Sequence, residues 1–175
     1  MKTLVTTLVV LFITTLSFSQ DSKYGVRGGI TISNLDYKDV PINENKHRNG
    51  FVFGVYAEYG LTETLSVAPE LQFSTEGSNH ENFANDYLNL PVLLKYSLID
   101  RISIGVGPQL GLKVHANDDG FKNLVFSGVG LVEINLFGDW SIDARYNYGF
   151  SNVFDDELLP EAKNAVWQFG LNYKI

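Results

Sequence analysis

The sequence contains no cysteine and a single methionine in 175 residues. The absence of cysteine excludes disulfide bonds and metal sites built on thiolates. It also excludes anchoring of the chain through a lipid-modified cysteine.

The sequence also lacks an excess of basic residues. Thirteen lysines and arginines stand against twenty aspartates and glutamates, which gives a net charge of −7 and a pI of about 4.8. Proteins that bind nucleic acid carry the opposite balance. We therefore expect no nucleic-acid partner, and the length suits one domain.

Long apolar runs are missing as well, with one exception at the N-terminus. Lys2 precedes an apolar run over residues 4–18, and Ser17-Phe18-Ser19 supplies a small-x-small triplet. This layout is typical of a secretory signal peptide. A membrane anchor helix is the alternative, but the run is shorter than the ~20 residues that a span requires. We predict a cleaved signal peptide over residues 1–20 and one domain over residues 21–175.

What the remaining chain does have is strict alternation, shown best by residues 165–175. Trp167, Phe169 and Leu171 alternate with Gln168 and Gly170, and the pattern continues to the last residue. Successive side chains of a strand point to opposite faces. This segment is therefore a strand with one apolar face and one polar face.

The same alternation recurs along the chain and predicts an all-β protein with eight antiparallel strands. The predicted strands cover residues 24–33, 51–59, 65–74, 87–96, 101–114, 125–136, 140–150 and 165–175. In 125–136 valines and leucines fall on both faces. Long polar connections, at 35–49, 76–86, 115–123 and 151–164, alternate with short ones. Such alternation is typical of an up-and-down transmembrane β-barrel of the outer membrane.

The direction of the apolar face separates that barrel from a soluble lipocalin-like carrier. Eight strands enclose a narrow bore that side chains fill. The large apolar residues are too many to fit inside it together at native packing density. Aromatic residues also sort by height into two girdles, as expected at two membrane interfaces. The girdle at the short turns comprises Tyr24, Tyr59, Tyr96, Trp140 and Tyr173, and the other comprises Phe51, Phe73, Phe126, Phe150 and Trp167.

The opposite face carries charges of both signs, which we expect to form an ion-pair network in the lumen. A buried charge must be paired. The predicted network comprises Arg27, Glu58, Glu70, Lys95, Lys113, Glu133, Asp143 and Arg145.

Five segments resemble the PorT-like outer-membrane β-barrel family of Bacteroidota, which are small barrels of the OmpA/OmpX type. The segments are YGVRGGITISNL, APELQFSTEG, DYLNLPVLLKYSL, ISIGVGPQLGLKV and SIDARYNYGFSNV. The resemblance covers the chain after the signal peptide. It implies a barrel in the outer membrane, and it implies no active site because the family shares none.

Few residues suggest chemistry, and we expect no catalytic, cofactor-binding or metal-binding residues. Glu133 and Asp143 should face each other, but a structural ion pair is favoured over acid-base catalysis. The histidines at 47, 80 and 115 fall in or beside long connections, as does the acidic run 155–157. Pro69, Pro91 and Pro108 fall inside strands, where proline is disfavoured. They predict a bulge or a weakened seam, which would either shape the wall or open laterally.

The sequence therefore predicts a non-enzymatic outer-membrane barrel with a filled lumen. Its external connections, 35–49 and 151–164 above all, would serve structural roles or meet partners. Those partners are outer-membrane lipids and, through the external loops, other envelope or secretion proteins. Two alternatives stay open: a lipid-modifying hydrolase that uses His115 or Ser151, and a soluble lipocalin-like carrier.

Overall fold

The computed structural model describes residues 22–37, 47–77, 84–114, 122–154 and 162–175. The predicted signal peptide, residues 1–20, lies outside the described residues. Among the described residues, none forms a helix that is both long and apolar enough to cross a membrane.

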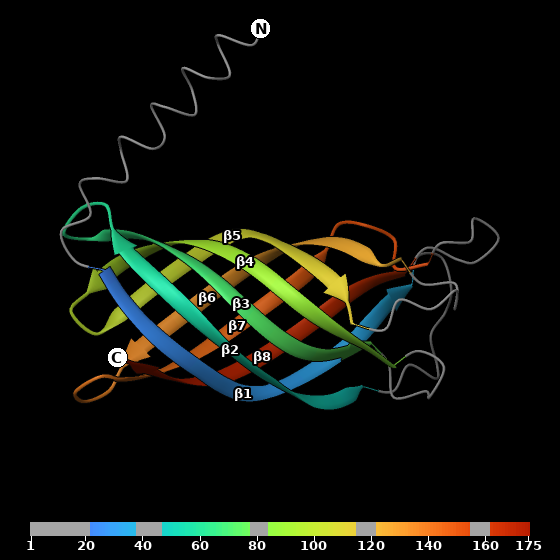
Figure 1. Ribbon diagram of the computed structural model, residues 1–175, viewed down its shortest axis with the longest axis horizontal. Helices are drawn as coiled ribbons and strands as arrows, with labels where there is room; N and C mark the ends of the chain where they lie inside the picture. The colour runs from blue at the N-terminus through green and yellow to red at the C-terminus, as the bar shows by residue number, and fades with distance from the viewer. Residues whose placement is uncertain (1–21, 38–46, 78–83, 115–121, 155–161) are drawn as a thin grey trace, which may run out of the picture.

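Eight antiparallel strands close into a barrel in which each strand pairs with its neighbours in the chain, and β1 pairs with β8. The strands are β1 (Ser22–Tyr37), β2 (Arg48–Gly60), β3 (Leu65–Gly77), β4 (Ala84–Ile99), β5 (Ile102–Lys113), β6 (Leu124–Asn135), β7 (Trp140–Gly149) and β8 (Ala162–Lys174). All of them run obliquely to the long axis of the barrel (Figure 1). The predicted fold class is confirmed, and closure leaves no strand edge unpaired.

The two faces of the wall follow the alternation of the sequence. On β8, Trp167, Phe169 and Leu171 are exposed on the outside, whereas Gln168 and Asn172 are buried inside. The same phase holds on every strand. On β6 it places Val129 and Leu131 inside the barrel and Val132 and Ile134 outside, as the sequence predicted. The outer wall is apolar, and the bore is largely polar.

Short connections join strands at one end of the barrel, which we call the turn end. The connection between β2 and β3 covers residues 61–64, as predicted. Between β6 and β7, Gly138 adopts a left-handed conformation with φ +54°, which glycine reaches without a steric penalty. The other end, where strands extend toward the long connections, is called the loop end.

The strands extend further toward the loop end than the sequence indicated. β1 continues to Tyr37 and β2 begins at Arg48, although 35–49 was predicted as a loop. β3 reaches Gly77, β4 starts at Ala84 and β8 starts at Ala162. The alternation of apolar and polar residues fades in these extensions, while backbone pairing continues. Periodicity therefore marked the apolar part of each strand and missed its polar continuation.

Candidate functional site: the lumen

The inward faces of the strands converge on a bore filled with buried polar side chains. Charged residues of both signs lie there with relative exposures of 3–7%, including Arg27, Glu70, Lys95, Glu133 and Arg145. Ionised groups lose their hydration when buried and need close partners of opposite charge. Their ion pairs form two groups of four residues.

The first group, the central cluster, consists of Arg27, Glu70, Asp143 and Arg145. Arg27 donates from Nε and Nη2 to the two carboxylate oxygens of Asp143, at 2.9 and 2.7 Å. Arg145 donates from Nε to Asp143, at 3.0 Å, and from Nη1 to Glu70, at 2.6 Å. Two cations and two anions balance, and the paired donors of Arg27 fix the Asp143 carboxylate in one orientation.

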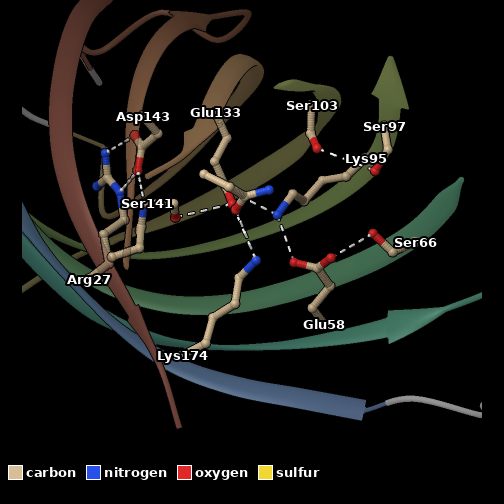
Figure 2. Close-up of polar contacts among 12 residues, drawn as sticks. Arg27, Glu58, Ser66, Lys95, Ser97, Ser103, Glu133, Ser141, Asp143 and Lys174 are labelled. Atoms are coloured by element: carbon tan, nitrogen blue, oxygen red, sulfur yellow. Dashed lines mark hydrogen bonds and ion pairs between the residues drawn. The ribbon is translucent and has the colours of Figure 1, made fainter. Parts of the chain in front are cut away.

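The second group, the turn-end cluster, consists of Glu58, Lys95, Glu133 and Lys174. Lys95 Nζ lies between two carboxylates, 2.7 Å from Glu58 and 2.9 Å from Glu133 (Figure 2). Lys174 approaches Glu133 at 3.7 Å. This group is again neutral in total. Both clusters therefore hold their charges without leaving a net charge in the bore.

Neutral side chains complete these contacts and were absent from the predicted network. Asn172 donates to Asp143 at 2.8 Å, and the Gln168 side-chain oxygen accepts from Arg27 at 3.1 Å. Gln72 donates to Glu70, and Ser141 donates to Glu133 at 3.2 Å. Lys174 was also left out. The signal was present, because each of these residues occupies a polar position in the alternation.

The remaining predicted lumen residue, Lys113, lies elsewhere on the inward face of β5. It is 7% exposed and faces Tyr87 in the register between β4 and β5, nearer the loop end. Glu133 and Asp143 are direct register partners across β6 and β7. The prediction that these two residues face each other is therefore confirmed. Their carboxylates nevertheless belong to different clusters, and each is paired with its own cations.

All ten predicted girdle residues lie on outward-facing positions of the wall. Trp140 and Tyr173 contact each other at the turn end, with ring centroids 4.8 Å apart. Phe51, Phe53 and Phe73 stack at the other end, with centroids 5.3–6.2 Å apart. The outward set comprises Tyr24, Tyr59, Tyr96, Trp140, Tyr173, Phe51, Phe73, Phe126, Phe150 and Trp167.

The loop end contains a buried apolar cluster, which we call the apolar cap; it consists of Leu35, Val153, Phe154 and Ala162, all of them at most 4% exposed. Backbone hydrogen bonds hold the segment in place, since Val153 N–H donates to Ala162 O and Lys122 N–H donates to Val153 O, both at 2.9 Å. Leu35 was predicted in a loop. Its burial follows from the extension of β1 beyond the predicted boundary.

One patch of the bore, between β3, β4 and β6, is apolar, although the same three strands also carry inward charged residues. Ala68, Leu93, Val129 and Leu131 form a buried cluster there, which we call the apolar lumen cluster. Strand pairing is interrupted at the same height, with no pairs between Pro69↔Val92 and Gln72↔Asn89 or between Pro91↔Gln109 and Leu94↔Val106.

The predicted bulge at these prolines is not found. The register is the same on both sides of each interruption, and the one register shift between β4 and β5 lies at Ser97/Ile99. Proline lacks the N–H that a ladder needs. The weakened seam is therefore a gap in hydrogen bonding, and neither strand carries the inserted residue that would define a bulge there.

The residues considered for chemistry do not come together in the described part of the chain. The Ser151 hydroxyl bonds the backbone of Phe126, accepting from N–H at 2.8 Å and donating to O at 3.3 Å. His47 is exposed, whereas His80, His115 and the acidic run 155–157 lie outside the described residues. No group of three or more His, Cys, Asp or Glu side chains converges among the residues described.

A comparison with protein-family models matches residues 4–174 to the outer membrane protein beta-barrel domain. The chain belongs to this family. It is therefore an integral protein of the outer membrane, and its strands span that membrane with the apolar wall toward lipid. In such barrels the short turns face the periplasm, so the loop end faces outward.

Solved structures with the same fold are distant in sequence. The attachment invasion locus protein Ail of Yersinia pestis, in complex with the heparin analogue sucrose octasulfate, is 15% identical with a TM-score of 0.54, covering 89% of this chain and 100% of Ail. Neisserial surface protein A is 12% identical with a TM-score of 0.57, at 89% and 100% coverage. A search of curated proteins finds no match.

Proposed function

We propose that this protein is a non-conducting, non-enzymatic barrel whose sealed bore holds the wall rigid while its outward end meets partners. The supporting observation is that the clusters cross the bore. β3 and β7 are four strands apart in a barrel of eight, so the 2.6 Å contact from Arg145 to Glu70 joins opposite walls. Lys95 of β4 likewise connects Glu58 of β2 with Glu133 of β6, which are also opposite strands.

The proposed seal has three levels along the axis. A recess of 570 Å³ opens at the turn end and is lined by Lys23, Glu58 and Thr62 among others. The two ion-pair clusters follow, and the apolar cap lies at the loop end. Moving an ion through this series requires breaking buried ion pairs, which leaves charges without partners and is costly.

Conductance in a planar bilayer tests the proposal. The wild-type protein should give no steady ion current. The double variant Glu70→Ala/Arg145→Ala removes one complete cation and anion pair from the central cluster and should admit a measurable current, provided that it folds. A steady, solute-permeable conductance of the wild type would contradict the proposal.

The girdles are proposed to sit at the two membrane interfaces. The chain has two tryptophans, Trp140 in the girdle at the turns and Trp167 in the other, and both are outward-facing and exposed. Lipids brominated near the head group should quench both, and lipids brominated near the chain ends should quench them weakly. Strong quenching by the deep bromines would put the tryptophans near the bilayer centre and contradict the proposed position of the girdles.

The partner-binding surface is proposed to be the outward end, where β1, β2 and β8 extend beyond their apolar segments. Candidate partners are outer-membrane lipids, the lipopolysaccharide layer, and envelope or secretion proteins. The structure of Ail with a heparin analogue is an example of a small barrel that binds an added ligand. Capture from intact outer membranes, with and without residues 38–46 and 155–161, would identify partners that depend on these connections.

We also infer that the chain is a PorT-like member from Bacteroidota with a cleaved signal peptide over residues 1–20, leaving a barrel domain over 21–175. The motifs quoted from the strands and the apolar run after Lys2 support this inference. N-terminal sequencing of the protein from outer membranes should read from Asp21 or nearby. A protein that begins at Met1 would contradict cleavage.

The two other functions find less support. A lipid hydrolase would need an available serine, and the Ser151 hydroxyl is engaged by the backbone of Phe126. An unchanged lipid A profile in a Ser151→Ala strain would argue against it further. A soluble carrier would need an apolar bore and a polar wall, which is the reverse of the arrangement here. Fractionation should recover the protein with membranes and not in solution.

A further inference from the structure

The outward third of the lumen contains a buried carboxylate that lies outside both ion-pair clusters. Glu76 is 4% exposed, and its two oxygens accept from Asn89 Nδ2 at 2.7 Å and from Asn164 Nδ2 at 2.6 Å. Among the described residues, no ion pair includes Glu76. The nearby Arg48 pairs instead with Asp86, at 3.3 Å, and donates to the backbone oxygen of Glu76 at 2.5 Å. A buried carboxylate whose side-chain hydrogen-bond partners are all neutral is unusual.

A small cavity lies beside this carboxylate. Its volume is about 10 Å³, and its lining includes Glu76, Gln109, Ser127, Asn147 and Asn164. A space of roughly this size accommodates one water-sized particle. Asn147 and Asn164 are 3% and 8% exposed. In the part of the chain that is described, Asn164 Oδ1 and both polar atoms of the Asn147 amide have no hydrogen-bond partner.

The surroundings of Asn147 make this amide hard to explain by packing. Its register partners are Val129 on β6 and Val166 on β8, and both are buried. Neither side chain can bond an amide, so a leucine would fill the position without losing hydration. An asparagine between two valines is favourable only where something else bonds it.

We propose that this cavity, the Glu76 site, binds one Na⁺ ion through the Glu76 carboxylate and the Oδ1 atoms of Asn147 and Asn164. Hard cations take oxygen ligands from carboxylates and amides. One carboxylate balances one positive charge, which fits a monovalent ion. The ion neutralises Glu76 in the way that lysine and arginine neutralise the carboxylates deeper in the bore.

The test measures thermal unfolding of the full folded chain in a neutral detergent. Sodium chloride is compared with choline chloride at the same ionic strength, because choline is too large for the cavity. Raising NaCl from about 1 to about 100 mM should raise Tm by about 3–6 °C more than the same increase in choline chloride. This is the shift expected when the Na⁺ concentration reaches about ten times the Kd of the site. Equal curves in the two salts would mean that a water molecule occupies the cavity, and would overturn the proposal.

Variants locate the site. Glu76→Gln and Asn147→Leu should each abolish the difference between the salts, and circular dichroism checks that both fold. Asn172→Leu is the matched control, because it removes another buried lumen amide, one that bonds Asp143. It should lower Tm in both salts and keep the difference between them. A difference that survives in Glu76→Gln and Asn147→Leu would place the ion elsewhere and contradict the proposal.

Discussion

The barrel fills its bore in two different ways on two sides of the wall. On β7, β8 and β1 most inward residues outside the apolar cap are polar, and Asp143 and Arg27 bond each other across the intervening β8. Pairing of β1 with β8 is unbroken from Gly25↔Lys174 to Tyr37↔Ala162. On the other side Ala68 of β3 and Leu93 of β4 meet Val129 and Leu131 of β6, and the β3–β4 and β4–β5 pairings have gaps beside prolines. The same two strands, β3 and β4, also carry Glu70 and Lys95 of the ion-pair clusters. Ion pairs depend on the orientation of donor and acceptor, whereas apolar contacts have no preferred direction.

The largest effect should come from breaking the polar side. Arg145→Met leaves Glu70 without its cation and Asp143 with one of two. Removal of one partner from a buried pair costs about 3–5 kcal/mol, so the free energy of unfolding in urea should fall by that amount. Arg101→Met is the control, because that side chain is exposed at a turn and its loss should change stability by about 0.5 kcal/mol or less. Equal losses in the two variants would show that the ion-pair clusters contribute no more to the free energy of unfolding than an exposed surface charge.

A smaller loss is expected on the apolar side. Leu93→Ala removes a fully buried side chain from the apolar lumen cluster and should lower the free energy of unfolding by about 2–3 kcal/mol through lost contacts and a cavity. Leu94→Ala, one residue on, faces lipid and opens no internal cavity. If the two changes cost the same, the apolar lumen cluster would not be packed as described.

The smallest effect concerns the proline seam. The amide hydrogen of Val92, which faces the pairing gap between β4 and β5, should exchange roughly tenfold faster than those of Ile30 and Thr31 in the unbroken ladder of β1. Pro108→Ala supplies an N–H and should slow exchange at Val92 while changing stability little. Uniformly slow exchange in both regions would remove the distinction between them.

The outer wall and the bore could be predicted from the sequence because membrane strands have a period of two. Every predicted girdle residue kept its face, and even β6, where Val129 and Leu131 share the polar face with Ser127 and Glu133, has the predicted phase. Lipid on one side and a narrow bore on the other leave little freedom for a strand to slip by one residue. Charge at alternating positions therefore indicated which residues would be buried.

Pairing partners and strand ends could not be read in the same way. Which cation meets which anion depends on the stagger of the closed sheet, so the crossing from Arg145 to Glu70 was not foreseen. The strand ends were missed because polar residues such as Glu76 and Asn85 continue the ladder without alternation of hydropathy. The Glu76 site was missed for the same reason, since 76–86 read as a loop.

The account depends on apolar side chains facing lipid while polar ones face the bore, and the absence of native cysteine permits a clean test. Single cysteines introduced at successive positions from Val166 to Tyr173 can carry a nitroxide, whose relaxation by oxygen reports contact with lipid. We predict maxima at Trp167, Phe169, Leu171 and Tyr173 and minima at Val166, Gln168, Gly170 and Asn172. Maxima at the second set, or no alternation along β8, would contradict the account.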